Sequence, residues 1–273
     1  RRSFMAAAAV SVAALALTAC GGSASSAASS VASSAASSEA VSSAAAAELT
    51  TVEAGKLTMA TNATFPPYEM TTDSGEIEGI DVDTAKAIAE KLGLELQIDD
   101  MEFDAALLSV QQGKADIVMA GVTVTDERKA VMDFSDSYAT GIQSIIVPND
   151  SDIASPDDLA GKKIGTQRGT TGYIYCSDDF GEDSVVAYDS GLTAVQALNN
   201  GQVDAVVIDN APATEYVAAN PGLKVLDTSY AEEDYAIGMA KGSALEDAVN
   251  KALEELKADG TLQAIVDKYI NAN

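Results

Sequence analysis

The chain has 273 residues, of which 42 are acidic and 16 are basic, so its formal net charge at neutral pH is −26. An acidic balance of this size disfavours binding to nucleic acid and to anionic lipid. The chain has two cysteines and no histidine, which excludes histidine-based catalytic triads, histidine zinc sites and cysteine metal clusters. We therefore expect no metal ion, no cofactor and no nucleic-acid partner.

The first 19 residues have the pattern of a secretory signal. Two arginines open the chain, and residues 4–17 are almost wholly Ala, Val, Leu and Met. This apolar run is shorter than the roughly 20 residues that a helix needs to cross a bilayer, and no later stretch is as apolar. We expect residues 1–19 to be removed on export and the mature protein to have no membrane-spanning helix.

The signal ends at a motif for lipid attachment. Residues Leu17–Gly21 (LTACG) resemble the bacterial lipobox, so we expect Cys20 to carry lipid and to anchor the protein at a membrane. Ordinary signal cleavage near this point, which would leave Cys20 without a function, is the alternative. Residues 20–48 are mostly Ser and Ala with almost no charge, and this composition predicts a flexible linker.

From residue 49 onward, strand-like and helix-like segments alternate, which is typical of an α/β fold with largely parallel sheets. Residues 56–60 and 94–98 alternate as strands. Residues 82–92 have helical spacing, with Asp81 as the predicted N-cap and Gly93 as the stop.

The chain contains a short internal repeat. Residues 108–118 (LSVQQGKADIV) and 195–206 (VQALNNGQVDAV) each predict the end of a helix, an amide pair, a glycine, and an aspartate directly before a buried strand. One αβ unit used twice suggests two α/β lobes of similar build.

Polar residues follow the predicted strand of each repeat. Open α/β sheets bind ligands at the carboxyl ends of their strands. Residues 120–128, after the first strand, offer a guanidinium, hydroxyls and backbone N–H groups, and Asp209, after the second, offers a carboxylate. A zwitterion would meet a complementary charge on each side.

The same residues carry a resemblance to a known family, the family 3 extracellular solute-binding proteins that serve ABC importers of polar amino acids. The resemblance extends over residues 55–271 and is carried by Ala60–Glu69 (ATNATFPPYE), Gly79–Gly93 (GIDVDTAKAIAEKLG), Ala120–Arg128 (AGVTVTDER), Asp133–Tyr138 (DFSDSY), residues 161–172 and the segment ending at Asp209. It implies a type II periplasmic-binding fold, in which two α/β lobes are joined by a two-segment hinge.

The family pattern also implies where the lobes divide. Residues 49–144 and 240–273 would form lobe 1, and residues 145–239 would form lobe 2. The chain would cross between the lobes near residues 144–148 and return near residues 236–240.

The resemblance assigns roles to individual side chains. Arg128 would bind the α-carboxylate of the ligand, because a guanidinium can bond both oxygens at once. Its alternative role is a surface ion pair with the neighbouring acids. Thr123 and the N–H of Gly121 would add hydrogen bonds to the same carboxylate, and Thr171 would reach it from lobe 2.

The other end of the ligand is assigned in the same way. Asp209 would bind the α-ammonium, with a helix N-cap as its alternative role. Phe65 and Phe103 would enclose the ligand side chain, or else belong only to the core. The complete set implied by the resemblance is Asn62, Phe65, Phe103, Ala120, Gly121, Thr123, Arg128, Gln167, Thr170, Thr171 and Asp209.

Asn62 bears on the identity of the ligand. Many family members that bind cationic side chains have an aspartate at this position, whereas this chain has a neutral amide. We therefore expect a polar or neutral amino acid, with a glutamine-like ligand favoured. A basic amino acid is the alternative, because Glu69 could satisfy a cation.

Two other classes of function remain open. Dehydratases that share this fold would need a buried carboxylate for acid–base chemistry, and the predicted cleft offers only Glu69 and Asp209, so we expect no enzyme. Sensor modules continue into a membrane helix, whereas this chain stops at Asn273. We expect an extracytoplasmic monomer that is held at the membrane through Cys20, delivers an amino acid to an ABC permease, and keeps Cys176 as a buried, inert thiol.

Overall fold

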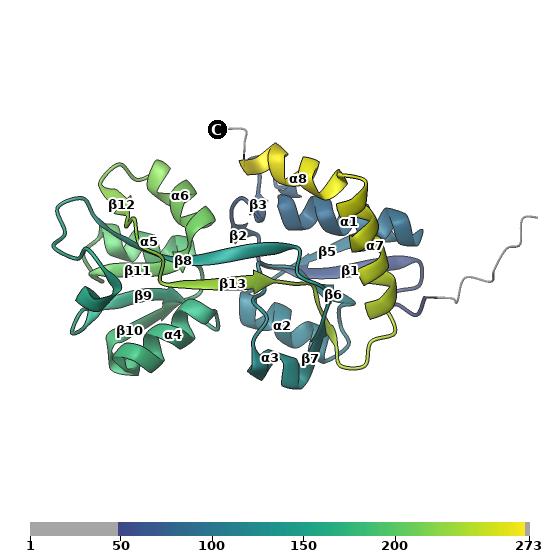
Figure 1. Ribbon diagram of the computed structural model, residues 1–273, viewed down its shortest axis with the longest axis horizontal. Helices are drawn as coiled ribbons and strands as arrows, with labels where there is room; N and C mark the ends of the chain where they lie inside the picture. The colour runs from purple at the N-terminus through teal and green to yellow at the C-terminus, as the bar shows by residue number, and fades with distance from the viewer. Residues whose placement is uncertain (1–48, 271–273) are drawn as a thin grey trace, which may run out of the picture. The chain divides into compact units, whose positions relative to one another are not determined.

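The computed structural model describes residues 49–270, which fold into two lobes within one unit of the chain (Figure 1). The predicted signal, the predicted lipidation site Cys20 and the predicted linker lie outside the described residues. No helix within residues 49–270 is long and apolar enough to cross a membrane.

Lobe 1 is built on a five-stranded sheet in the order β5-β1-β6-β14-β7. Its strands are β1 (Lys56–Thr61), β5 (Glu95–Asp100), β6 (Ile117–Val118), β7 (Met132–Phe134) and β14 (Gly238–Ala240). Strands β5, β1 and β6 are parallel, and β14 runs antiparallel to both of its neighbours. A small antiparallel sheet of β2 (Thr64–Phe65), β3 (Glu69–Thr71) and β4 (Ile77–Glu78) belongs to the same lobe.

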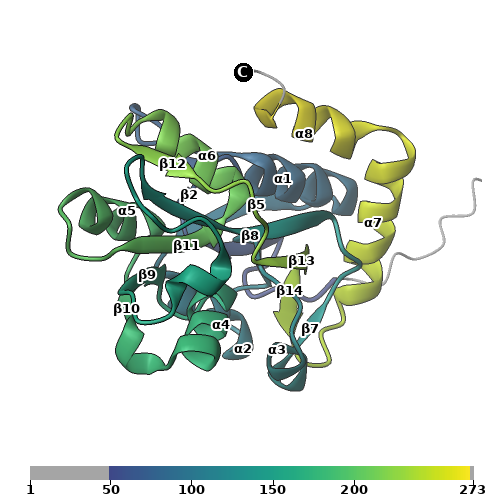
Figure 2. The same ribbon diagram turned by 60° about the vertical axis from the view of Figure 1, so that its left-hand side comes forward.

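Five helices accompany this sheet. They are α1 (Ile80–Leu92), α2 (Phe103–Gln111), α3 (Asp126–Val131), α7 (Glu246–Ala258) and α8 (Thr261–Ile270). The last two helices of the described chain pack beside α1, as Figures 1 and 2 both show. Lobe 1 is therefore discontinuous in sequence.

Lobe 2 has a six-stranded sheet in the order β10-β9-β11-β8-β12, with β13 also paired to β8. Its strands are β8 (Ala139–Pro148), β9 (Ile164–Gln167), β10 (Val185–Tyr188), β11 (Ala205–Asp209), β12 (Leu223–Val225) and β13 (Ala231–Tyr235). Its helices are α4 (Thr171–Phe180), α5 (Gly191–Asn199), α6 (Asn210–Ala218), and the short 3-10 turns η1 (Pro156–Leu159) and η2 (Glu182–Ser184).

The chain crosses between the lobes a few residues before the first predicted crossing. Residues 139–143 of β8 pair with β13, and these two segments run between the lobes (Figure 1), whereas residues 144–148 pair with β11 and β12 inside lobe 2. The physical reason is burial, since Ile145, Ile146 and Val147 are fully enclosed by the lobe 2 sheet. The return is made by residues 231–235 of β13, and residues 236–237 then lead into β14 of lobe 1.

The helix α1 also begins differently from the prediction, because Gly79 and not Asp81 is its N-cap residue. The backbone passes so close to Tyr68 that a Cβ on Gly79 would lie 2.1 Å from the Tyr68 carbonyl oxygen. Asp81 instead lies in the first turn and is fully buried.

The two repeat segments, residues 108–118 and 195–206, have the same local structure. Gly113 and Gly201 both adopt left-handed φ values, of 65° and 66°. Each following aspartate then binds the backbone of a neighbouring strand segment: Asp116 accepts the N–H of Thr58 at 2.7 Å, and Asp204 accepts the N–H of Lys163 at 2.8 Å. The repeated αβ unit predicted from the sequence is confirmed, and it places the carboxyl ends of β6 and β11 at corresponding positions.

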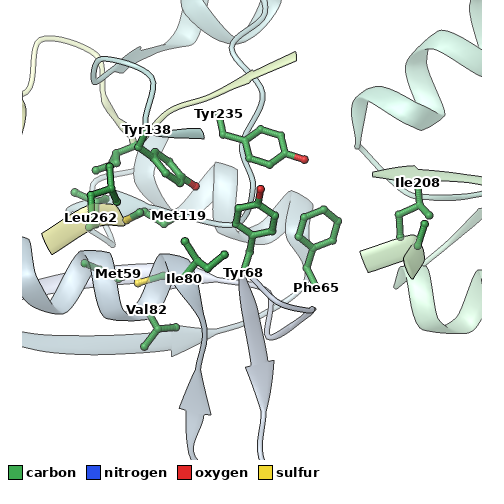
Figure 3. Packing of buried hydrophobic residues seen from close by; sticks show 14 of the residues in the cluster. Met59, Phe65, Tyr68, Ile80, Val82, Met119, Tyr138, Ile208, Tyr235 and Leu262 are labelled. Atoms are coloured by element: carbon green, nitrogen blue, oxygen red, sulfur yellow. The ribbon is translucent and has the colours of Figure 1, made fainter. Parts of the chain in front are cut away.

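The core comes close to the junction between the lobes. Figure 3 shows Phe65, Tyr68 and Tyr235 grouped there, with ring centroids 5.9 Å apart for Phe65 and Tyr68 and 5.3 Å apart for Tyr68 and Tyr235. In lobe 2, Cys176 is fully buried, and burial raises the pKa of its thiol to about 12, as expected for an inert thiol.

Candidate functional site

A cavity lies between the two lobes. Its lining residues are Asn62, Phe65, Glu69, Phe103, Ala120, Gly121, Thr123, Arg128, Gln167, Thr170, Thr171 and Asp209. The space between their atoms is about 320 Å³, including the part that opens to solvent. All eleven residues implied by the resemblance are brought together here, and Glu69 joins them. Within residues 49–270, no group of three acidic or cysteine side chains is placed to hold a metal ion.

Arg128 lies in α3 and is 8 % exposed. Its guanidinium donates to the carbonyl oxygen of Thr123 at 2.8 Å and to that of Gly169, in the other lobe, at 3.1 Å. The guanidinium carbon also lies 5.4 Å from the centroid of the Phe103 ring. Because a guanidinium has five N–H donors, these contacts leave donors for a ligand.

Asp209 ends β11 and is also 8 % exposed. One of its oxygens accepts a hydrogen bond from the Tyr235 hydroxyl, and the other accepts from the Gln143 amide at 2.9 Å. Burial raises the pKa of Asp209 to about 7 and outweighs these hydrogen bonds, which act in the opposite direction. Although Asp209 occupies the N-cap position of α6, its side chain makes no capping bond.

Two pairs of side chains join the lobes across the cavity. The Thr123 and Thr171 hydroxyls are 3.4 Å apart, and the Gln167 amide donates to the Asn62 side-chain oxygen at 2.8 Å. The Asn62 amide nitrogen is itself bound to the carbonyl of Met101 at 2.9 Å. Asn62 is therefore a contact between the lobes as well as a lining residue, so its neutral amide says less about the ligand than the sequence suggested.

The predicted role of the Gly121 N–H is wrong in this structure. This N–H donates to the Asp81 carboxylate at 3.0 Å. Asp81 is fully buried, and burial raises its pKa to about 6, so its oxygens need donors more than those of a solvated carboxylate would. The lack of a side chain at Gly121 makes room for Phe65, because a Cβ there would lie 2.7 Å from the Phe65 ring.

The two hinge strands add residues that the sequence analysis missed. Glu233 on β13 accepts hydrogen bonds from Thr123 at 3.1 Å and from Gln143 on β8 at 3.0 Å. Gln143 directly precedes Ser144 and the apolar run of β8, and this polar pair beside a buried run was a detectable signal. Glu233 lies within a run of acidic residues, and nothing in that run marks it out.

Glu69 is the least satisfied group of the cavity wall. It is fully buried, and neither of its carboxylate oxygens accepts a hydrogen bond from an N–H or O–H group of residues 49–270. Burial raises its pKa well above the ordinary value, and the nearby charge of Asp81 raises it further. A ligand that carries N–H donors to this point would supply the missing hydrogen bonds.

Two α/β lobes joined by paired crossing strands, with a polar cavity between them, define the type II periplasmic-binding fold. The model of the bacterial extracellular solute-binding proteins, family 3, matches residues 57–272, and the chain belongs to this family.

Relatives and solved structures agree with this membership. The L-cystine-binding protein TcyJ of Escherichia coli K12 is 33 % identical over 225 residues, which are 81 % of this chain and 85 % of the relative. The arginine-, lysine-, histidine-binding protein ArtJ of Geobacillus stearothermophilus superimposes with a TM-score of 0.76 at 35 % identity, covering 80 % of this chain and 96 % of the other. An ancestral arginine-binding protein bound to glutamine gives a TM-score of 0.75 at 42 % identity, covering 80 % and 99 % of the two chains.

Proposed function

We propose that this protein captures an α-amino acid between its lobes outside the cytoplasm and delivers it to the permease of an ABC importer. One observation carries the proposal: Arg128 of lobe 1 and Asp209 of lobe 2, both more than nine-tenths buried, line the same cavity. Their opposite charges match the carboxylate and the ammonium of an amino acid. A ligand bound to both groups would join the lobes.

The mechanism follows from this division of the charges. An amino acid binds first through its carboxylate to Arg128, and Asp209 and Thr171 then add contacts that exist only when the lobes meet. A ligand shifts the balance between open and closed forms only by its difference in affinity for them. The lobe 2 contacts supply that difference, and the closed form is the one that the permease recognises.

We assign the ligand side chain to the basic class, with arginine as the first candidate. Glu69 is buried without a hydrogen-bond donor, and a guanidinium would supply both charge and donors. The names of ArtJ and of the ancestral protein, which include arginine, support this choice.

A glutamine-like ligand is the second candidate. The raised pKa of Glu69 would leave this group neutral, and a neutral carboxyl pairs well with an amide. The ancestral arginine-binding protein whose structure contains glutamine supports this candidate. In the sequence, the neutral amide of Asn62 favours it as well.

The proposal also covers export, lipid attachment and the monomeric state of the protein. The sequence predicts export by residues 1–19, a lipid on Cys20, a linker over residues 20–48, and a monomer that binds its ligand without converting it. Mass spectrometry of the protein from a bacterial host would show an N-terminal diacylglyceryl cysteine at Cys20. An unmodified Cys20, or recovery of the bound amino acid in altered form, would contradict the corresponding part.

The deciding experiment is a thermal-shift screen against the common amino acids. The protein is first unfolded and refolded once, which removes any ligand carried over from the host. A ligand at a hundred times its dissociation constant stabilises by about 2.7 kcal/mol, which corresponds to roughly 5–10 °C for a domain of this size. Arg128→Ala should abolish the shift. Arg168→Ala is the matched control, because Arg168 is 57 % exposed and pairs loosely with Asp189 at 3.8 Å. No shift with any amino acid would contradict the proposed function.

A further inference from the structure

One glycine of lobe 2, Gly169, contacts lobe 1 beside Arg128. Gly169 lies in the loop between β9 and α4 and has a left-handed φ of 74°. Its carbonyl oxygen accepts a hydrogen bond from the Arg128 guanidinium at 3.1 Å. Arg128 therefore contacts the opposite lobe directly, through the backbone of this residue.

Asp104 occupies the space where a side chain of residue 169 would be. A Cβ built on Gly169 would lie 1.5 Å from Asp104 Oδ1 and 2.6 Å from Asp104 Cγ. Non-bonded carbon and oxygen atoms do not approach so closely, because attraction turns to repulsion well before that distance. A side chain at residue 169 would therefore force the Asp104 carboxylate out of its present contact with lobe 2.

The position of Asp104 also matters electrostatically. Asp104 lies in the first turn of α2, directly after Phe103, whose ring packs against the Arg128 guanidinium. The charge of Asp104 acts on Arg128. A side chain at residue 169 would displace the Asp104 carboxylate from this place and so change the charge that acts on Arg128 in the closed form.

We propose that Gly169 is a positioning residue that couples Arg128 to closure of the lobes. Its carbonyl holds the guanidinium, and its missing side chain admits Asp104. A side chain at position 169 favours the open form, in which the two residues are apart. The effect on amino-acid affinity rests on the proposed function, whereas the steric effect on the lobes does not.

The test begins with Gly169→Ala in the full chain, using the amino acid that gives the largest thermal shift. We expect its affinity to fall roughly ten-fold or more. Gly161→Ala is the matched control, since Gly161 is also in lobe 2, has a φ of 76°, and has no atom within 4 Å of its would-be Cβ. This control carries the same backbone strain without the collision, and its affinity should change by less than about two-fold.

The second step is a double-mutant cycle with Asp104→Ala. Truncating Asp104 removes the atoms that collide, so Gly169→Ala should cost less than about three-fold in that background. An equal loss with and without Asp104 would overturn the proposal, because the effect would then come from backbone strain. Should Gly169→Ala fold poorly, Asp104→Gln lengthens the opposing side chain without changing the left-handed backbone, and it should also favour the open form.

The third step needs no ligand. Spin labels at Gln112→Cys in lobe 1 and Asp178→Cys in lobe 2 report the distance between the lobes in a Cys20→Ser background, where the fully buried Cys176 is protected from labelling. Gly169→Ala should lengthen the distances relative to the parent chain, and Asp104→Ala should reverse the change. Unchanged distances would overturn the inference. If no amino acid binds the parent chain, the proposed function fails, and the distances still decide this inference.

Discussion

At the scale of single residues, buried charge is unevenly distributed around the cavity. Four acids near the site, namely Glu69, Asp81, Asp209 and Glu233, are more than nine-tenths buried. Arg128 is the only basic side chain within residues 49–270 with comparable burial. A site with this excess of acids favours a ligand that brings additional positive charge or N–H donors.

Replacing Glu69 with glutamine tests this argument. Glu69→Gln keeps the shape and removes the carboxylate, so the affinity for arginine should fall by roughly thirty-fold while that for glutamine stays within about three-fold. Isothermal titration with both amino acids measures the difference. Glu76→Gln, at an exposed position in the loop between β3 and β4, is the control. Unchanged arginine affinity would show that Glu69 does not receive the ligand side chain.

The raised pKa of Asp209 predicts opposite effects of pH on binding and on stability. Only the ionised carboxylate binds an ammonium group, so affinity should be nearly constant above pH 7 and should fall by up to about ten-fold per pH unit below it. In the ligand-free protein between pH 3.8 and about 7, Asp209 is protonated in the folded state and ionised in the unfolded state. Asp209 therefore contributes stability that is present below its ordinary pKa of 3.8 and is lost as pH rises towards about 7.

Titration calorimetry and urea unfolding between pH 5 and 8 measure the two effects. Asp209→Asn should bind weakly, with a much flatter dependence on pH. A wild-type affinity that is independent of pH in this range would contradict the role of Asp209 as the group that binds the ammonium.

At the scale of elements, the start of α1 is fixed by a backbone contact. Gly79 passes the Tyr68 carbonyl so closely that a methyl group would displace β3 from the helix. Asp81, two residues further along, then reaches the Gly121 N–H at 3.0 Å and holds the loop that follows β6. One glycine thus positions a strand, a helix and a segment of the cavity wall.

Gly79→Ala should therefore destabilise the protein by about 2–4 kcal/mol, because overpacking against a backbone that cannot yield adds to conformational strain. Gly93→Ala is the comparison, since Gly93 ends the same helix with a φ of 71° and open space around its would-be Cβ. It should cost only about 1 kcal/mol. Urea unfolding measures both, and equal losses would show that the Tyr68 contact is not the cause.

At the scale of the whole described structure, the two lobes are joined by few direct bonds beyond the crossing strands. The Gln167–Asn62 hydrogen bond, at 2.8 Å, is one that needs no ligand. It lies between two buried residues from different lobes, so it exists only while the lobes are together.

Gln167→Ala should weaken amino-acid binding by roughly five-fold, since a buried hydrogen bond contributes about 1 kcal/mol to the closed form. The unfolding free energy of the ligand-free protein should change less than this, because each lobe keeps its own core. Calorimetry and urea unfolding of the same variant compare the two quantities. A large loss of stability without loss of affinity would show that Gln167 acts within lobe 2 alone.

The sequence alone determined the α/β class and the repeated unit. These features depend on local rules: hydrophobic period, glycine at left-handed helix ends, and polar residues at the carboxyl ends of strands. Most residues that line the cavity were predicted instead through the resemblance to the solute-binding family. Arg128 and Asp209 were identifiable because each directly follows such a strand or the loop after it.

Only the tertiary structure decided what each group binds. The Gly121 N–H donates to Asp81, and the Asn62 side-chain oxygen accepts from Gln167. Glu233 reaches the site from β13, which follows β6 by more than 100 residues. Hydrogen-bond partners depend on distances between segments that are remote in sequence, and no local pattern records those distances. The crossing point was misplaced for the same reason, since a buried strand looks alike whichever lobe encloses it.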